Sequence, residues 1–302
     1  MKHDAIIDCL IVGGGPAGLT AATYLGRYRR SVILVDAGES RAALIPESHN
    51  YPGYAGIAGT DLLKLLRRQA GDFGARLIEG RVDALEPDGD QLLLARFGGE
   101  TVRARAVLLA TGIVDKDPPL PGIRIAVQKG TLRYCPICDG YEVSDERIGV
   151  FGSVRSGGSK ALFLRTYSAD VTLLLTEAPT DADEDMLKTL DASGVTVSSA
   201  LRFDLEEQGT QIAALFPDGT QHEFDVMYPA LGCEVRSELA TALGATCDEA
   251  GCLLVDPHQR TAAPGILAAG DVVSDLHQLS VAVGHAAIAS TAIHNSLPRN
   301  FR

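Results

Sequence analysis

Cys135 and Cys138 are the side chains in this 302-residue chain that are best suited to chemistry. A Cys-x-x-Cys pair can be oxidised to a disulfide and reduced back to a dithiol. Pro136 suits the first turn of a helix, which would place a sulfur near an electropositive helix end. Asp139 follows the pair, and a carboxyl there could supply or remove the proton that disulfide exchange demands. The stretch is therefore a candidate redox site.

The same residues also have simpler interpretations. Cys135 and Cys138 could form half of a zinc site that Cys247 and Cys252 complete. Those two cysteines lie far along the chain with four residues between them, which is not a distinctive zinc spacing, so we expect no metal centre. Asp139 could be an ordinary turn residue.

The elements that must position the cysteine pair begin near the N-terminus. Residues 6–12 and 31–35 are mainly apolar and are predicted to form buried strands, and 19–26 continue a helical period between them. The sequence GGGPAG at residues 13–18 joins the first strand to the helix. Asp36 ends the second strand, 18 residues beyond the last glycine. This arrangement predicts a dinucleotide-binding unit.

Each member of this pattern has a physical role. Gly13 allows the tight turn, Gly15 lets backbone amides approach a pyrophosphate, and Gly18 lets the helix pack closely on the strand. The helix N-terminus adds unpaired N–H groups and the positive end of a dipole. Asp36 can accept hydrogen bonds from a ribose. A tight glycine turn without a ligand is the structural alternative.

Two later segments indicate that the nucleotide is FAD. Residues 106–112 and 265–271 are apolar strands that end in Thr-Gly and Gly-Asp. Asp271 can accept hydrogen bonds from the ribityl hydroxyls of a flavin. A helix rich in small residues follows Gln278, and its dipole could stabilise a reduced, anionic flavin. Each segment alone is an ordinary βα unit, but together they predict FAD.

These motifs span nearly the whole chain, which resembles the low-molecular-weight thioredoxin reductase family of flavin disulfide oxidoreductases. The matching motifs are Gly13–Gly18, Asn50-Tyr51-Pro52-Gly53, Ala110-Thr111-Gly112, Cys135–Gly140, and Gly270-Asp271 with Gln278. The resemblance implies an α/β fold of two Rossmann-like, three-layer dinucleotide-binding domains. A discontinuous FAD domain would comprise residues 1–116 and 245–302, and an inserted NAD(P)-binding-like domain, 117–244, would carry the dithiol. A homodimer is also implied.

The resemblance further implies individual roles. Cys138 would face the flavin, Cys135 would attack the partner disulfide, and Asp139 would act in proton transfer. The partner would be a thioredoxin-like protein or a small dithiol or disulfide. The residues expected to contact FAD are Gly13, Gly15, Pro16, Ala17, Gly18, Asp36, Ala37, Asn50, Val82, Thr111, Gly112, Asp271, His277, Gln278 and Leu279.

The inserted domain departs from the family pattern where NADPH would bind. Its turn, GSVRSG at residues 152–157, has Val154 in the middle-glycine position, where a branched side chain is expected to crowd the pyrophosphate. Glu177 stands where the family carries a His-Arg-Arg cluster for the 2′-phosphate, although it could bond the 2′-hydroxyl of NADH. We therefore expect poor NADPH binding, while NADH stays possible. Rescue by Arg155 or Lys160, or a divergent loop that still works, is the alternative.

The composition of the chain argues against some classes of binding partner. The formal charge of −12 disfavours nucleic acid and anionic membrane. No stretch approaches the ~18 apolar residues of a membrane span, and the six cysteines show no secreted disulfide framework. A cytoplasmic location is the expectation. Cys9 and Cys233 are expected to pack and not to react.

The sequence as a whole predicts an FAD-dependent dithiol/disulfide oxidoreductase that works without NADPH. It would pass electrons between FAD, the Cys135–Cys138 pair and a thiol or disulfide substrate. Three alternatives remain: a dithiol oxidase with oxygen as acceptor, a thioredoxin reductase driven by ferredoxin or a reduced flavin, and a flavin-bound redox sensor without turnover.

Overall fold

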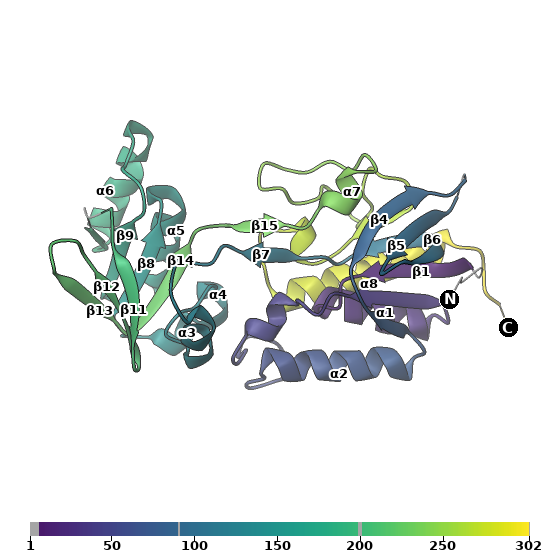
Figure 1. The fold of residues 1–302 in the computed structure, drawn as a ribbon, viewed down its shortest axis with the longest axis horizontal. Coiled ribbons are helices and arrows are strands. Elements are labelled where there is room, and N and C mark those ends of the chain that lie inside the picture. Colours follow the sequence, from purple (N-terminus) through teal and green to yellow (C-terminus); the bar gives the residue numbers. More distant parts are fainter. Residues whose placement is uncertain (1–5, 90, 199–200, 302) are drawn as a thin grey trace.

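The computed structural model of the chain describes residues 6–89, 91–198 and 201–301. Figure 1 shows two groups of elements joined by a pair of thin strands. Each group is an α/β unit built on a largely parallel sheet, as the predicted fold class requires.

The first unit is built on a seven-stranded sheet with the order β3-β2-β1-β6-β5-β4, in which β16 also pairs with β6. Its strands are β1 (Ile6–Val12), β2 (Val32–Asp36), β3 (Arg76–Glu79), β4 (Val82–Pro87), β5 (Leu93–Phe97), β6 (Glu100–Leu109) and β16 (Ile266–Ala268). Pairing is parallel among β3, β2, β1, β6 and β16, and antiparallel among β4, β5 and β6. Because β16 comes from late in the chain, two separate stretches of sequence build this unit.

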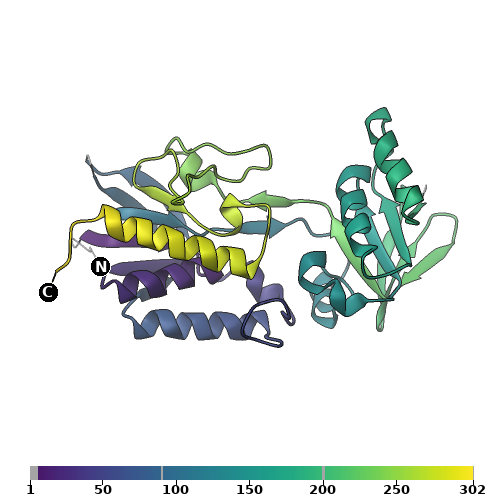
Figure 2. The same cartoon turned by 180° about the vertical axis from the view of Figure 1, so that it is seen from behind.

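Alternation along β1 divides its side chains between two cores. Cys9 and Ile11 pack under the helices α1 (Pro16–Arg27), α2 (Gly59–Asp72) and α8 (Leu279–Ser296), which run along one face of the sheet (Figure 2). Leu10 and Val12 face the opposite core. Both faces are covered, so the strand is a continuous apolar run from Cys9 to Val12. None of the described helices, α8 included, is both long and apolar enough to cross a membrane.

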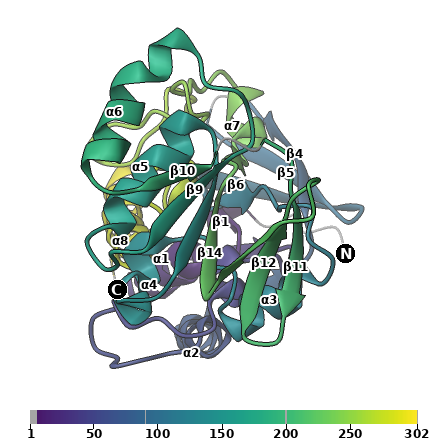
Figure 3. The same cartoon turned by 90° about the vertical axis from the view of Figure 1, so that its left-hand side faces the viewer.

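The second unit has a parallel sheet in the order β10-β9-β8-β14, covered on both faces (Figure 3). Its strands are β8 (Ile148–Gly152), β9 (Val171–Leu175), β10 (Thr196–Ser198) and β14 (Val226–Ala230). Helices α5 (Val154–Leu164) and α6 (Glu184–Ala192) pack on one face. The other face is covered by α3 (Ile123–Lys129) and an antiparallel sheet of β11 (Asp204–Gln208), β12 (Gln211–Leu215) and β13 (Gln221–Phe224).

Several short elements lie around the two sheets. They are η1 (Arg41–Leu44), α4 (Pro136–Asp139), η2 (Tyr141–Val143), η3 (Asp181–Asp183), α7 (Glu238–Thr241) and η4 (Asp271–Val273). Helix α4 carries the cysteine pair into the space between the units.

The units are connected by the antiparallel strands β7 (Ile113–Asp115) and β15 (Cys233–Val235), in which Asp115 is the Cα partner of Cys233. Helix α7 follows β15 and packs through Ala240 into the core of the first unit. The expected boundary at residue 244 assigns α7 to the inserted domain, but its apolar side chains lie on the first sheet.

Candidate active site

One cavity of about 760 Å³ extends from the glycine turn after β1 to the cysteines of α4. It is lined by residues of both units. The residues expected to contact FAD all line it except Gly18, and so do Cys135, Cys138 and Asp139. The structure thus brings the sequence-predicted site residues into one place.

Three glycines of the turn have no space for a side chain. Gly13 has a φ of +110°, and a Cβ on it would lie 2.2 Å from the carbonyl oxygen of Ala110. A Cβ on Gly18 would lie 1.9 Å from the carbonyl oxygen of Gly13, so this glycine lets α1 pack on the turn and does not line the cavity. A Cβ on Gly14 would lie 2.1 Å from Oδ2 of Asp36. Gly14 was missed, although it is the middle glycine of an unbroken run of three.

The N-terminus of α1 is open toward the cavity. Gly15 is its N-cap and offers no side-chain hydrogen bond, and Pro16 occupies the first turn. The amides of this turn lack intrahelical partners and suit a pyrophosphate. Asp36, at the end of β2, accepts from the Gly38 amide at 2.9 Å and pairs with Arg67. A carboxylate has about four acceptor positions, so Asp36 can still accept from a ribose.

Polar groups gather at the other end of the cavity. Burial raises the pKa of Asp271, whereas the neighbouring His277 and Arg41 oppose this rise. Nε2 of His277 is buried and has no hydrogen-bond partner among the described residues. A buried polar atom normally has a partner, so a polar ligand is expected there. Together with the glycine turn and the open helix end, this unpartnered atom makes the cavity fit FAD.

An ion pair between the first unit and the connecting strand β7 was not predicted. Arg41 of η1 donates to Asp115 of β7 through two hydrogen bonds of 2.6 and 3.0 Å. Both residues line the cavity. They lie 74 positions apart, and nothing in the sequence pairs them.

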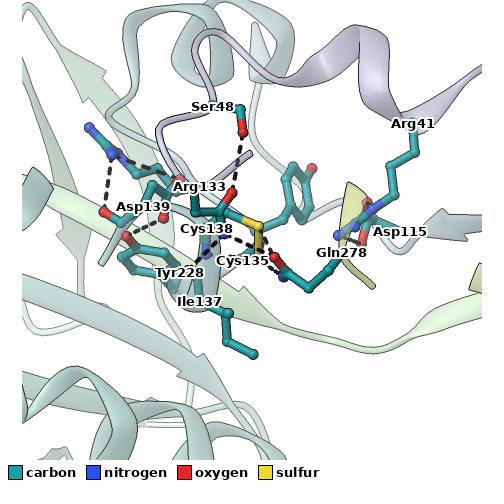
Figure 4. The surroundings of a disulfide bond; sticks show 12 residues. Arg41, Ser48, Asp115, Arg133, Cys135, Ile137, Cys138, Asp139, Tyr228 and Gln278 are labelled. Carbon is teal, nitrogen blue, oxygen red and sulfur yellow. Dashed lines mark hydrogen bonds and ion pairs between the residues drawn. A yellow bond between two sulfur atoms is a disulfide. The ribbon is translucent and has the colours of Figure 1, made fainter. Parts of the chain in front are cut away.

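Cys135 and Cys138 form a disulfide at the N-terminus of α4 (Figure 4). Pro136 stands at the first helical position, as predicted, and Sγ of Cys135 accepts from the Cys138 amide at 3.2 Å. Cys247 and Cys252 remain free thiols. The sulfurs of the pair are bonded to each other.

Two residues expected to contact the flavin also hold the disulfide turn. Nε2 of Gln278 lies 3.4 Å from the sulfurs of both Cys135 and Cys138. Nδ2 of Asn50 donates to Oε1 of Gln278 at 2.9 Å and to the carbonyl of Ile137 at 3.3 Å. The disulfide therefore faces the first unit.

Asp139 is not a simple turn residue, because its carboxyl has specific partners. The hydroxyl of Tyr228 donates to Oδ1 at 2.8 Å, and Nη1 of Arg133 lies 3.8 Å from Oδ2. Burial raises the pKa of Asp139 to about 6, against the opposing effects of Arg133 and Tyr228. Sequence reasoning missed both partners, since Tyr228 lies within an apolar strand.

The turn after β8 differs from the turn after β1. Val154 is the first residue of α5, is 2% exposed and packs in the core with Val150 and Leu173. The expectation that its side chain crowds a pyrophosphate is wrong, because that side chain faces the core. The helix end is occupied by Ser153, whose Oγ accepts from the Ser156 amide at 3.1 Å.

Two other residues that were considered for NADPH binding, Lys160 and Glu177, have clear positions in the structure. Nζ of Lys160 donates to the carbonyls of Tyr134 and Pro229 at 3.0 and 2.6 Å. Glu177 is exposed just beyond the end of β9.

Comparison with known proteins gives a consistent result. The family model for pyridine nucleotide-disulphide oxidoreductases matches residues 7–287. A thioredoxin reductase of Mycolicibacterium smegmatis is 30% identical over 295 residues, which cover 94% of either chain. Among solved structures, HlmI is 31% identical with a TM-score of 0.89, covering 98% of this chain and 93% of HlmI. Thioredoxin reductase from Streptococcus pyogenes is 28% identical with a TM-score of 0.88, covering 97% and 98%.

Proposed function

The chain belongs to the pyridine nucleotide-disulphide oxidoreductase family, and on that premise we propose that it exchanges electron pairs between FAD, the Cys135–Cys138 pair and a thiol or disulfide substrate. It is an FAD-dependent disulfide oxidoreductase of the thioredoxin reductase type. One observation carries the proposal. The disulfide and the glycine turn line the same cavity, and Gln278 contacts both sulfurs.

The first unit supplies the groups that would hold FAD. The open N-terminus of α1 would bind the pyrophosphate, Asp36 the ribose and Asp271 the ribityl chain. His277 would gain a partner for its buried Nε2. Bound FAD would supply two-electron redox chemistry beside the sulfurs.

We assign attack on the substrate to Cys135 and exchange with FAD to Cys138. When a substrate thiolate attacks Cys135, the Cys135–Cys138 bond breaks and its electron pair moves to Cys138. Gln278 donates toward both sulfurs and would stabilise the thiolate that forms. Asp139, in the same helical turn, would move the proton.

We further propose that NADPH is not the electron donor. The amides at the start of α5 are partly used by Ser153, whereas those at the start of α1 have no side-chain cap. Glu177 would repel a 2′-phosphate. This contrast favours a second candidate function, a dithiol oxidase in which a small dithiol or a thioredoxin-like protein reduces the disulfide and oxygen is the final acceptor.

The domain division and assembly are also proposals. We place the FAD domain in the unit that contains β1 and β16 and the inserted domain in the unit that contains β8, with crossings on β7 and β15. Their separate cores support this division. We propose a homodimer on the family resemblance and a cytoplasmic location on the composition of the chain.

The deciding experiment is anaerobic reduction of the purified flavoprotein, followed by visible absorbance. NADPH, NADH and dithiothreitol are added in separate samples. We expect bleaching by dithiothreitol, with recovery and peroxide formation when air is admitted. Rapid bleaching by NADPH would overturn the NADPH proposal, and bleaching by NADH alone would assign NADH as donor. If none bleaches the flavin, ferredoxin and reduced flavin are the donors to test.

A further inference from the structure

A buried tyrosine contacts the acid of the redox turn. Tyr228 comes from β14, is 0% exposed and donates its hydroxyl to Oδ1 of Asp139 at 2.8 Å. Nη1 of Arg133 lies 3.8 Å from the other carboxyl oxygen. Figure 4 shows this cluster beside the disulfide turn, on the side away from Gln278.

Packing alone does not account for a tyrosine at this position. The other four residues of β14 are apolar, and the ring of Tyr228 lies in a core of aliphatic side chains. A phenylalanine would fill the same core without a hydroxyl to satisfy. The hydroxyl is directed at the carboxyl of Asp139, the residue that follows Cys138.

The hydroxyl acts on Asp139 as a permanent donor. Burial raises the pKa of Tyr228 above its ordinary value, so the phenol keeps its proton. A donor to a carboxylate stabilises the ionised form. The charged groups that face Asp139 are Arg133, which precedes α4, Glu142 of η2 and Lys160 of α5.

We propose that Tyr228 is a positioning residue for proton transfer, whose hydroxyl fixes the Asp139 carboxyl and sets the pH at which that carboxyl exchanges its proton. The proposal rests on the proposed function. When a substrate thiolate attacks Cys135, the disulfide bond breaks and its electron pair moves to Cys138. The Asp139 acid gives its proton to that thiolate and becomes a carboxylate. Tyr228 stabilises the carboxylate and keeps its own proton.

The test compares the wild-type protein with Tyr228→Phe in the FAD-loaded form. Infrared difference spectra follow the carboxyl band of Asp139 against pH, and the band is assigned by its loss in Asp139→Asn. We expect a wild-type midpoint near 6 and a midpoint about one pH unit higher in Tyr228→Phe, because a donor to the carboxylate is lost. The pH profile of reduction by dithiothreitol should move by the same amount.

Tyr134→Phe is the matched control. Tyr134 lies one residue before the cysteine pair, and its phenol donates to Asp117 at 2.6 Å. Removal of this hydroxyl should leave the Asp139 midpoint in place. In an Asp139→Asn background, Tyr228→Phe should not move the pH profile.

An unchanged midpoint in Tyr228→Phe would overturn the proposal, as would an equal shift in Tyr134→Phe. A shifted midpoint supports the coupling even if no dithiol reduces the flavin. In that case the failure belongs to the proposed function alone, because the infrared titration needs no turnover.

Discussion

The side-chain amide of Asn50 donates to the side-chain oxygen of Gln278 across 2.9 Å, although the two residues lie 228 positions apart. Gln278 in turn donates toward both sulfurs of the disulfide, and Asn50 toward the carbonyl of Ile137. Two amides of the first unit therefore hold the redox turn of the second. The reactivity of the sulfurs depends on how the two units meet.

Replacement of Gln278 should make the thiolate form of the reduced cysteine pair less stable. In Gln278→Leu the reduced pair loses its side-chain donor, so we expect the thiol pKa to rise by roughly half to one unit and exchange to slow by roughly three- to tenfold at neutral pH. Alkylation rates measured against pH report this change. Gln221→Leu, which removes an exposed amide, is the control. Equal alkylation profiles in wild type and Gln278→Leu would contradict the prediction.

The two active cysteines should act as a unit. Cys135→Ser and Cys138→Ser should each reduce dithiol turnover by about a thousandfold or more, because neither leaves a disulfide to exchange. Both should retain FAD. The measurement is flavin reduction by a dithiol. Cys247→Ser, which replaces a free thiol, should keep wild-type turnover, and a comparable loss there would reopen the role of the other cysteines.

Gly14→Ala should lower the FAD content. A Cβ would meet the Asp36 carboxyl at 2.1 Å, so the acid or the turn must move, at about 1–3 kcal/mol. Gly71→Ala is a matched control, because a Cβ at that helical position has no neighbour within 4 Å and should be neutral or stabilising. The flavin-to-protein absorbance ratio and thermal unfolding distinguish the two variants. Full FAD content in Gly14→Ala would show that the turn can relax.

Stability should respond to pH through Asp139. Its pKa rises on folding from 3.8 to about 6 because of burial, so its stabilising effect is fully present below 3.8 and is lost as pH rises through 6. At pH values well above 6, Asp139→Asn should therefore unfold with a free energy higher by up to about 3 kcal/mol. Below 3.8 this advantage should vanish. Urea unfolding at two pH values tests the difference.

Asp225→Asn is a control for which the opposite change in stability is expected. The hydrogen bond from Arg147 lowers the pKa of Asp225 to about 2, so its stabilising effect is present above 3.8 and is lost as pH falls through 2. Asp225→Asn should destabilise the protein at neutral pH. A change of the same sign in the free energy of unfolding of both variants would contradict the assignment of Asp139 as a buried carboxyl with a raised pKa.

The cap on α5 should be structural. Ser153→Ala should lower the free energy of unfolding by about 1 kcal/mol, since the Ser156 amide loses its acceptor. Reduction of the flavin by dithiol should be unchanged. Ser159→Ala, at an exposed site within the same helix, should have a smaller effect on stability. An equal effect of the two variants would show that Ser153 is not a functional cap.

Local patterns predicted the first nucleotide turn and the disulfide turn well. Gly18 and Pro136 act within a few residues of their partners, so spacing alone indicated their positions. The contacts of Tyr228 with Asp139 span 89 positions and follow from the order of the strands, which the sequence does not display. The direction of Val154 was misjudged because a one-residue change in where α5 begins turns that side chain from the ligand side into the core.

Asp115 and Cys233 pair across the two connecting strands. The second unit is therefore one long hairpin loop inserted into the first unit. The entropic cost of closing such a loop is the cost of bringing its two ends together, and this cost grows only slowly with the length of the loop. Strands β7 and β15 hold those ends side by side, so β16 can join β6 whatever lies within the loop. The sheet that would hold the flavin can therefore stay the same while the inserted sequence changes.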